Sequence, residues 1–214
     1  MNISIHNIKV SEIIGLEAYG ALAIDLKIEI DKIISNISEP ILLVIDFTDL
    51  NPLTYEFVEI SLKDIVNYNR EKNDLLILYR IDKYEFSELV TGIIDMLELQ
   101  SKNYSQLNEN ELLAHHYSIV HEDENNSINY LGNLSEVEEY ILNIIEEKGN
   151  TTHNEIDEYL KSNEKSNYCE EITKSVDRLF YLRFIFLHKE SDDTPTQFYS
   201  IKHLQENASK SKRK

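Results

Sequence analysis

The chain of 214 residues is 42% apolar, which is enough for one large domain or two small ones. It has no apolar run of about 18 residues or more, and no basic segment followed by a long apolar core at its start, so neither a membrane span nor a secretory signal is expected. Cys169 is the only cysteine, which excludes an intramolecular disulfide and favours a reducing, cytoplasmic location.

The charge is strongly negative and unevenly distributed. The net charge is −18, from 39 acidic and 21 basic residues. Residues 1–132 carry 23 acidic and 9 basic residues, whereas residues 133–214 carry 16 acidic and 12 basic ones, with four of the bases in the final "KSKRK". A uniform negative charge would repel nucleic acid and anionic membranes. The acidity belongs mainly to the first part of the chain.

Three units of a strand followed by a helix are predicted in the first hundred residues. The runs "ILLVIDF" and "NDLLILYRI" are continuously apolar, as expected for central strands covered on both faces. Ser11 is the candidate cap of a long helix whose apolar stripe includes Ile24 and Ile28. Gly15 and Gly20 within it each lower helix stability by about 1 kcal/mol relative to alanine, which indicates that the chain packs closely there. The order predicts an α/β sandwich with a largely parallel or mixed sheet, with strands at 2–10, 41–47 and 73–81 and helices at 11–36, 54–66 and 84–100.

A β-hairpin is predicted at 114–131, after a polar loop. Apolar alternation surrounds an acidic, asparagine-rich turn, and the hairpin either completes the first sheet or connects two domains. His115, His116 and His121 lie here beside acidic residues. In a strand, however, His115 and His121 would be about 20 Å apart, and His116 would face the other way. No shared metal ion is therefore expected.

A different pattern begins at Ser135. Ser135 and Glu138 form a capping-box pattern, and Gly149 marks the end of that helix. A second short helix is predicted from 151, a third from 166, and two strands around a polar turn between 184 and 201. Three short helices and a hairpin resemble a winged helix-turn-helix, a small α+β fold. The predicted boundaries are 1–132 for the α/β domain, 133–203 for the winged helix and 204–214 for a disordered basic tail.

The segment "VIDFTDLNPLTYEFVEI" carries a resemblance of its own. Asp46 and Phe47 end a strand, residues 48–53 form a turn, and Thr54 begins a helix. This layout resembles the STAS family, named after sulfate transporters and anti-sigma-factor antagonists, and more closely its compact STAS-like bacterial branch. The resemblance covers roughly residues 1–100, or 1–132 if the hairpin belongs to the same domain.

The STAS-like resemblance implies an exposed tip that binds a protein partner. In family members, a serine at this tip is phosphorylated by a kinase that also binds the domain. The corresponding partner-binding or switch residues here are Thr54, Tyr55, Glu56 and Phe57, and the implied partner is a GHKL-type histidine-kinase-like protein. Because the family's serine-rich tip is replaced, three roles stay open. Thr54 is phosphorylated at the positive end of the helix dipole, Glu56 supplies a permanent phosphate-like charge, or Thr54 is a plain helix cap.

The winged-helix resemblance implies contact with DNA or with protein. In such modules the third helix enters the major groove and the wing contacts phosphates. The candidate DNA contacts are Lys174, Arg178, Arg183 and Lys189. Carboxylates outnumber bases on the predicted outer face of the third helix, which is a poor electrostatic match to DNA. Protein contact, including formation of a homodimer, is therefore the alternative.

No pattern of catalytic residues is present in the sequence. There is no glycine-rich phosphate loop, no hydrolase triad spacing and no cysteine cluster, and Cys169 is expected to be packed or inert. The sequence predicts a non-enzymatic regulatory protein without cofactor or metal. Two alternatives stay open, namely a sequence-specific transcription regulator and an acidic, phage-encoded or defence-associated protein that mimics nucleic acid.

Overall fold

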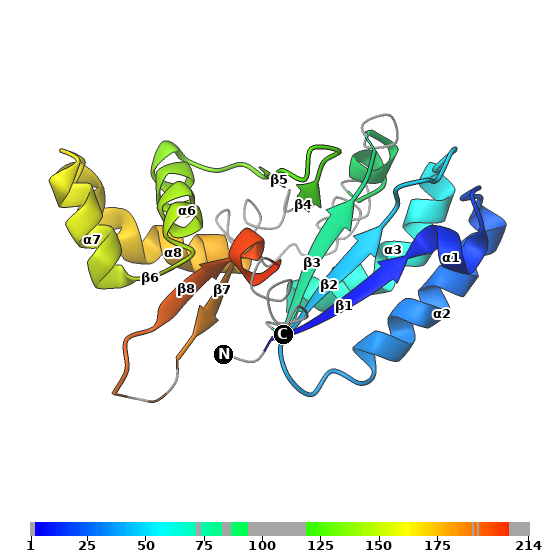
Figure 1. The fold of residues 1–214 in the computed structure, drawn as a ribbon, viewed down its shortest axis with the longest axis horizontal. Helices are drawn as coiled ribbons and strands as arrows, with labels where there is room; N and C mark the ends of the chain where they lie inside the picture. The colour runs from blue at the N-terminus through cyan, green and yellow to red at the C-terminus, as the bar shows by residue number, and fades with distance from the viewer. Residues whose placement is uncertain are drawn as a thin grey trace, which may run out of the picture. The chain divides into compact units, whose positions relative to one another are not determined.

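The chain folds into two compact units, residues 2–131 and residues 132–214. A computed structural model describes residues 3–71, 74–82, 87–93, 119–189, 191 and 193–205. Among these residues, no helix is both long and apolar enough to cross a membrane. Figure 1 shows the helices and strands of both units.

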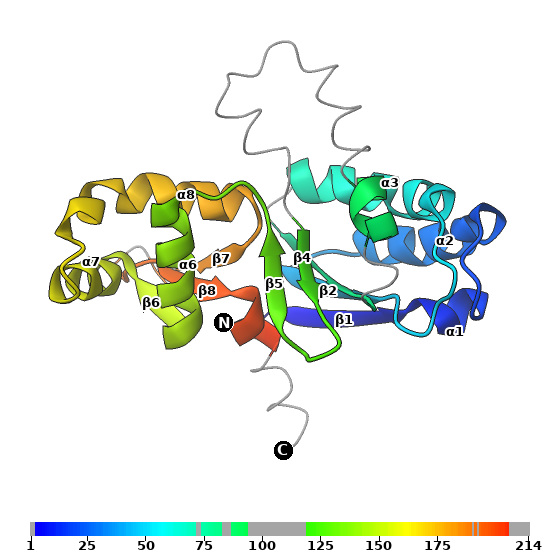
Figure 2. The same cartoon turned by 90° about the horizontal axis from the view of Figure 1, so that it is seen from above.

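The first unit is an α/β domain built on a mixed five-stranded sheet in the order β1-β2-β3-β4-β5. The first four strands are parallel neighbours, and the last is antiparallel to β4 (Figure 2). The predicted α/β class with a mixed sheet is therefore confirmed. The strands are β1 Ser4–Lys9, β2 Ile41–Asp46, β3 Leu75–Arg80, β4 Ile119–Glu122 and β5 Ile128–Leu131.

The helices of the first unit lie on one face of its sheet (Figure 1). They are α2 Ala23–Ile34, α3 Tyr55–Glu71 and a helical segment at 87–93. Consecutive parallel strands are neighbours here, so right-handed crossovers carry each connecting helix to the same side. Alternate residues of β2, Ile41, Leu43 and Ile45, pack in one core with Leu26 of α2 and Phe57 of α3.

The opposite face of the central strands is buried as well. Leu42 and Val44 of β2, Leu76 and Leu78 of β3 and Val120 of β4 are each at most 2% exposed. Strands buried on both faces lose the alternation of apolar and polar residues. This explains the continuous apolar runs that identified β2 and β3 in the sequence.

The long helix predicted at 11–36 is wrong in its first half. A short helix, α1 Val10–Ile14, is followed by an irregular stretch and the 3-10 turn η1 Gly20–Leu22 before α2 begins. Gly15 has a φ of 85°, which a glycine adopts readily and which ends a helix. Lys9, rather than Ser11, occupies the N-cap position of α1. The expected close packing is found at Gly20, where a Cβ would lie 2.5 Å from Glu56 Cδ, and not at Gly15, where nothing lies within 4 Å.

The predicted hairpin completes the first sheet. Strand β4 pairs in parallel with β3 and antiparallel with β5, which decides between the two roles left open by the sequence. Asp123 Oδ1 accepts hydrogen bonds from the backbone N–H groups of Asn125 and Ser127, both at 2.9 Å. These bonds hold the turn and keep the pKa of Asp123 below its usual value.

The second unit combines helices with a three-stranded antiparallel sheet in the order β6-β8-β7. The predicted capping box of Ser135 with Glu138 is confirmed, and Thr152 and Glu155 form a second one. Gly149, with a φ of 79°, ends the first helix as predicted. The elements are α6 Glu136–Lys148, β6 Asn150–Thr152, α7 His153–Ser162, η2 Ser166–Glu171, α8 Ile172–Tyr181, β7 Ile185–His188 and β8 Gln197–Ser200.

Two details of the second unit differ from the sequence prediction. The third helix is divided into the 3-10 segment η2 and the α-helix α8. Residues 201–205 are helical and Leu204 is 2% exposed. The first two residues assigned to the basic tail therefore pack with the second unit, because Leu204 contributes to its core. Residues 206–214 lie outside the described part of the chain.

Candidate functional site

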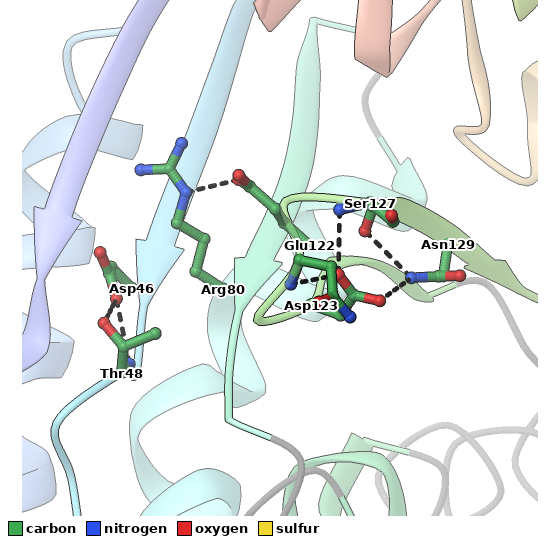
Figure 3. A network of polar contacts seen from close by, with 8 residues as sticks. Asp46, Thr48, Arg80, Glu122, Asp123, Ser127 and Asn129 are labelled. Atoms are coloured by element: carbon green, nitrogen blue, oxygen red, sulfur yellow. Dashed lines mark hydrogen bonds and ion pairs between the residues drawn. The ribbon is translucent and has the colours of Figure 1, made fainter.

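The loop after β2 is held by its own side chains. Asp46 Oδ1, at the end of β2, accepts a hydrogen bond from the backbone N–H of Thr48 at 3.0 Å and another from the Thr48 hydroxyl (Figure 3). Phe47, Leu50 and Leu53 are 1–2% exposed. Three buried anchors in one short loop fix its path, so the start of α3 is held firmly relative to the sheet.

Thr54 caps the N-terminus of α3. Its Oγ1 accepts a hydrogen bond from the backbone N–H of Phe57 at 3.3 Å and donates one to the backbone O of Ala18 at 3.0 Å. The cap, which was one of the two roles open for Thr54, is thus observed. Phosphorylation of Thr54 would replace the hydroxyl proton and would therefore remove the hydrogen bond that Thr54 donates to Ala18 O.

The loop before α2 is joined to the loop before α3. Ala18 and Leu53 form an isolated parallel bridge. The N–H of Asn51 donates to Leu16 O at 3.0 Å, and the N–H of Ala18 donates to Pro52 O at 3.1 Å. These backbone bonds make the two loops one continuous surface at the carboxyl ends of β1 and β2.

The four residues assigned to the tip differ in accessibility. Glu56 is exposed, Thr54 and Tyr55 are half-buried, and Phe57 is completely buried in the core. The Glu56 side chain lies over Gly20, and a side chain at position 20 would displace it. In this conformation Glu56 is therefore the most accessible of the four residues, and Phe57 serves to anchor α3.

Four large apolar side chains are exposed in the segment 16–28, which is joined to the tip through Ala18, and these four are called the apolar cluster. Leu16 is 64% exposed, Tyr19 46%, Ile24 56% and Ile28 48%. Leu16 and Tyr19 flank the Ala18 backbone that binds Thr54, and Ile24 and Ile28 are adjacent on α2 at a spacing of four residues. We define the tip surface as these four apolar residues together with Glu56. The sequence analysis missed it because Ile24 and Ile28 fitted the buried stripe of the predicted helix.

The charge around the tip surface is negative. Glu17, Asp25 and Glu56 are exposed, and none of the ion pairs found among the described residues involves them. The nearest base on α2, Lys27, is bound by Asp64 and by Asp31. These hydrogen bonds raise the pKa of Lys27 and neutralise its charge locally. The apolar cluster is thus bordered mainly by free carboxylates.

A row of alternating charges crosses the carboxyl ends of the parallel strands. Lys9, Asp46, Arg80 and Glu122 lie side by side in register, and Arg80 Nε binds Glu122 Oε2 at 2.5 Å (Figure 3). Nucleotides bind open α/β sheets where the strand order reverses. The described strands follow each other without such a reversal. Within the row Arg80 is paired with Glu122, whereas Lys9 is paired with Asp49 of the following loop at 2.7 Å.

The four candidate DNA contacts differ in accessibility. Lys174 and Lys189 are exposed. Arg178 binds Glu138 Oε1 at 3.2 Å and the backbone O of Asn133 at 2.6 Å. Arg183 is 5% exposed and donates to the backbone O of Phe180 at 2.7 Å. Both arginines therefore stabilise the second unit in this conformation, so that of the four candidates only the two lysines are exposed to a phosphate.

The histidines and Cys169 were the remaining candidates for a metal site or a reactive thiol. No group of three or more His, Cys, Asp or Glu in the described ranges is arranged to hold a metal ion. His115 and His116 lie outside those ranges, and burial lowers the pKa of His121. Cys169 donates a hydrogen bond to Asp157, which raises the pKa of the thiol. A raised pKa disfavours the reactive thiolate.

Comparisons of this chain with protein-family models, with curated proteins and with solved structures find no match. The STAS-like and winged-helix resemblances therefore rest on this chain's own residues and on the order of its helices and strands.

Proposed function

We propose that the protein is a non-enzymatic regulatory protein of the cytoplasm, whose STAS-like first unit binds a protein partner through the tip surface. The observation that carries this proposal is the concentration of exposed apolar residues in the segment 16–28. Of the five large apolar side chains found exposed in the described part of the chain, four belong to the tip surface: Leu16, Tyr19, Ile24 and Ile28. Exposed apolar residues that gather in one place, with a polar border, are typical of sites that bind other proteins.

The geometry of the first unit supports the STAS-like assignment. The four parallel strands of the mixed sheet follow each other in sequential order, with α2 and α3 packed on one face. The strand that ends in Asp46 leads through a short loop into the capped helix α3. The tip residues inferred from the family resemblance adjoin the exposed apolar cluster, because Ala18 binds Leu53 and Thr54. The family resemblance and the exposed apolar residues therefore both point to the tip surface.

The partner is expected to present an apolar patch bordered by basic residues. The exposed carboxylates of Glu17, Asp25 and Glu56 would accelerate association with such a surface and would repel acidic ones. A GHKL-type kinase-like protein is the partner that the family resemblance implies. Since the Thr54 hydroxyl caps α3, Glu56 supplies the constant negative charge in this proposal.

The second unit is proposed to be a winged helix that serves in assembly. The element order α6-β6-α7-α8-β7-β8 and the sheet order β6-β8-β7 support that assignment. The exposed Tyr181, 63% accessible at the end of α8, favours contact with protein. The exposed carboxylates Glu170, Glu171 and Asp177 disfavour contact with DNA.

The proposal is tested by capture of complexes from the native host. The tagged wild-type chain is compared at moderate salt with Glu56→Lys and Ile28→Glu, and protein and DNA are identified in the same eluate. Glu124→Lys is the matched control, because Glu124 is exposed in the β4–β5 turn of the same unit and the charge change is identical. Loss of one protein partner from both tip variants, but not from the control, supports the proposal. Unaltered capture by both tip variants contradicts it, and a discrete enriched DNA site would favour the transcription regulator.

A further inference from the structure

Strand β1 forms an edge of the first sheet (Figure 2). It pairs in parallel with β2 over six residues, and no described strand pairs with its other side. His6 and Asn7, in the middle of β1, are exposed. Proteins usually protect such an edge with proline, a bulge or several charged residues, and Ser4–Lys9 contains only Lys9 at its end. The edge is therefore available to another extended chain.

The direction of the backbone groups along β1 follows from one hydrogen bond. The N–H of Ser4 donates to Pro40 O at 3.3 Å, towards β2. Backbone groups alternate in direction along a strand, so Ser4, His6 and Ile8 bond towards β2. The N–H and C=O groups of Ile5 and Asn7 point away from the sheet. They offer an incoming strand a ladder of main-chain hydrogen bonds.

A groove runs beside the first half of this edge. Its volume is about 260 Å³, compared with the roughly 150 Å³ of an engineered apolar cavity that holds benzene. An aliphatic or aromatic side chain therefore fits it. The groove lies between β1 and the C-terminal turn of α2, and it is lined by Ser4, His6, Lys32, Ile33, Asn36, Ile37, Ser38, Glu39 and Ile41. A helix beside a free edge strand is a geometry that binds extended peptides by strand addition.

The charges beside the groove indicate which peptide would be favoured. Lys32 lines the groove and is paired with Glu29, three residues earlier on α2, at 2.7 Å. Glu39 accepts a hydrogen bond from Ser4 Oγ at 2.8 Å, and no ion pair among the described residues neutralises its charge. The border of the groove is therefore negative overall and attracts a basic peptide.

We propose that β1 is a strand-addition site for an extended segment of a partner protein. The segment carries one apolar side chain for the groove and a lysine or arginine that meets Glu39. This site is separate from the tip surface, because Ser4 and Ile41 lie at the amino ends of β1 and β2, whereas the tip surface lies at their carboxyl ends. The proposal can therefore succeed or fail independently of the tip surface.

The test uses random ten-residue peptides displayed on phage and selected on the full-length chain. We expect the enriched peptides to combine an apolar residue with a nearby lysine or arginine. A synthetic copy of the most enriched peptide should then slow amide hydrogen exchange at Ile5 and Asn7 of the wild-type chain, since their N–H groups become hydrogen-bonded. This measurement requires no mutation. A lack of enrichment, or slowed exchange confined to other parts of the chain, would overturn the proposal.

A substitution that removes only the outward donor gives the second test. Asn7→Pro deletes the outward N–H and leaves the bonds of His6 and Ile8 to β2 in place. An edge strand tolerates a proline at such an outward position. Asn7→Val is the matched control that keeps the N–H. We expect Asn7→Pro to weaken peptide binding about fivefold or more, and Asn7→Val to bind like the wild type. Equal binding by both variants would refute strand addition. Exchange at Ile5 and Asn7 that slows with protein concentration alone would overturn the peptide assignment in favour of self-pairing of β1.

Discussion

The Thr54 cap allows the tip to be tested without a known partner. Thr54→Ala removes the acceptor for the Phe57 N–H and the donor to Ala18 O. Loss of an N-cap costs about 1 kcal/mol, and loss of a second hydrogen bond costs about 1 kcal/mol. Since Thr54 is only half-buried, water replaces part of these bonds, and the expected loss of unfolding free energy in the first unit is about 1.5 kcal/mol. Thr54→Ser keeps both bonds and should cost less than about 0.5 kcal/mol.

The measurement is a urea titration followed by the NMR amide signals of the first unit, with linear extrapolation to water. Residue-resolved signals are needed because the two units of the chain can unfold in separate transitions. Hydrogen exchange at the Phe57 amide should accelerate in Thr54→Ala but not in Thr54→Ser. If Thr54→Ala leaves the unfolding free energy unchanged, or if Thr54→Ser is equally damaging, the hydroxyl does not act as the cap described here.

Two further predictions concern the carboxyl end of the first sheet. Burial lowers the pKa of His121 below its ordinary 6.5, and Asp123 only partly offsets this. The unfolded chain therefore binds more protons, and stability should be full above about pH 7 and decrease as the pH falls through about 6.5. His121→Gln should reduce this decrease in thermal unfolding scans, and an unchanged decrease in that variant would contradict the assignment to His121. Arg80→Met leaves the nearly buried Glu122 without the cation at 2.5 Å and should destabilise the unit by about 2 kcal/mol, discounted for the partial exposure of Arg80. The double variant with Glu122→Gln should lose less than the sum of the two single variants in urea titrations, and strict additivity would contradict the pairing.

Local sequence patterns were sufficient to predict several helices and strands of both units. The capping box of Ser135 and the stop at Gly149 depend on bonds between residues within four positions of each other, so the sequence alone determines them. The continuous apolar run of β2 likewise indicated a strand buried on both faces. The alternation of strands and helices was sufficient for the α/β class, because connection rules leave few arrangements for such an order.

Only the tertiary structure decided which apolar residues are exposed and which charged residues are engaged. Ile24 and Ile28 match the helical period but lie outside the core, because α2 begins at Ala23, after the break at Gly15, and turns Leu26 and Ile30 inward. The pairing of Arg80 with Glu122 joins residues 42 positions apart, and the register of three strand pairs sets the row of charges. Spacing in the sequence reports the period of a helix or strand, but burial depends on the orientation of that element against its neighbours.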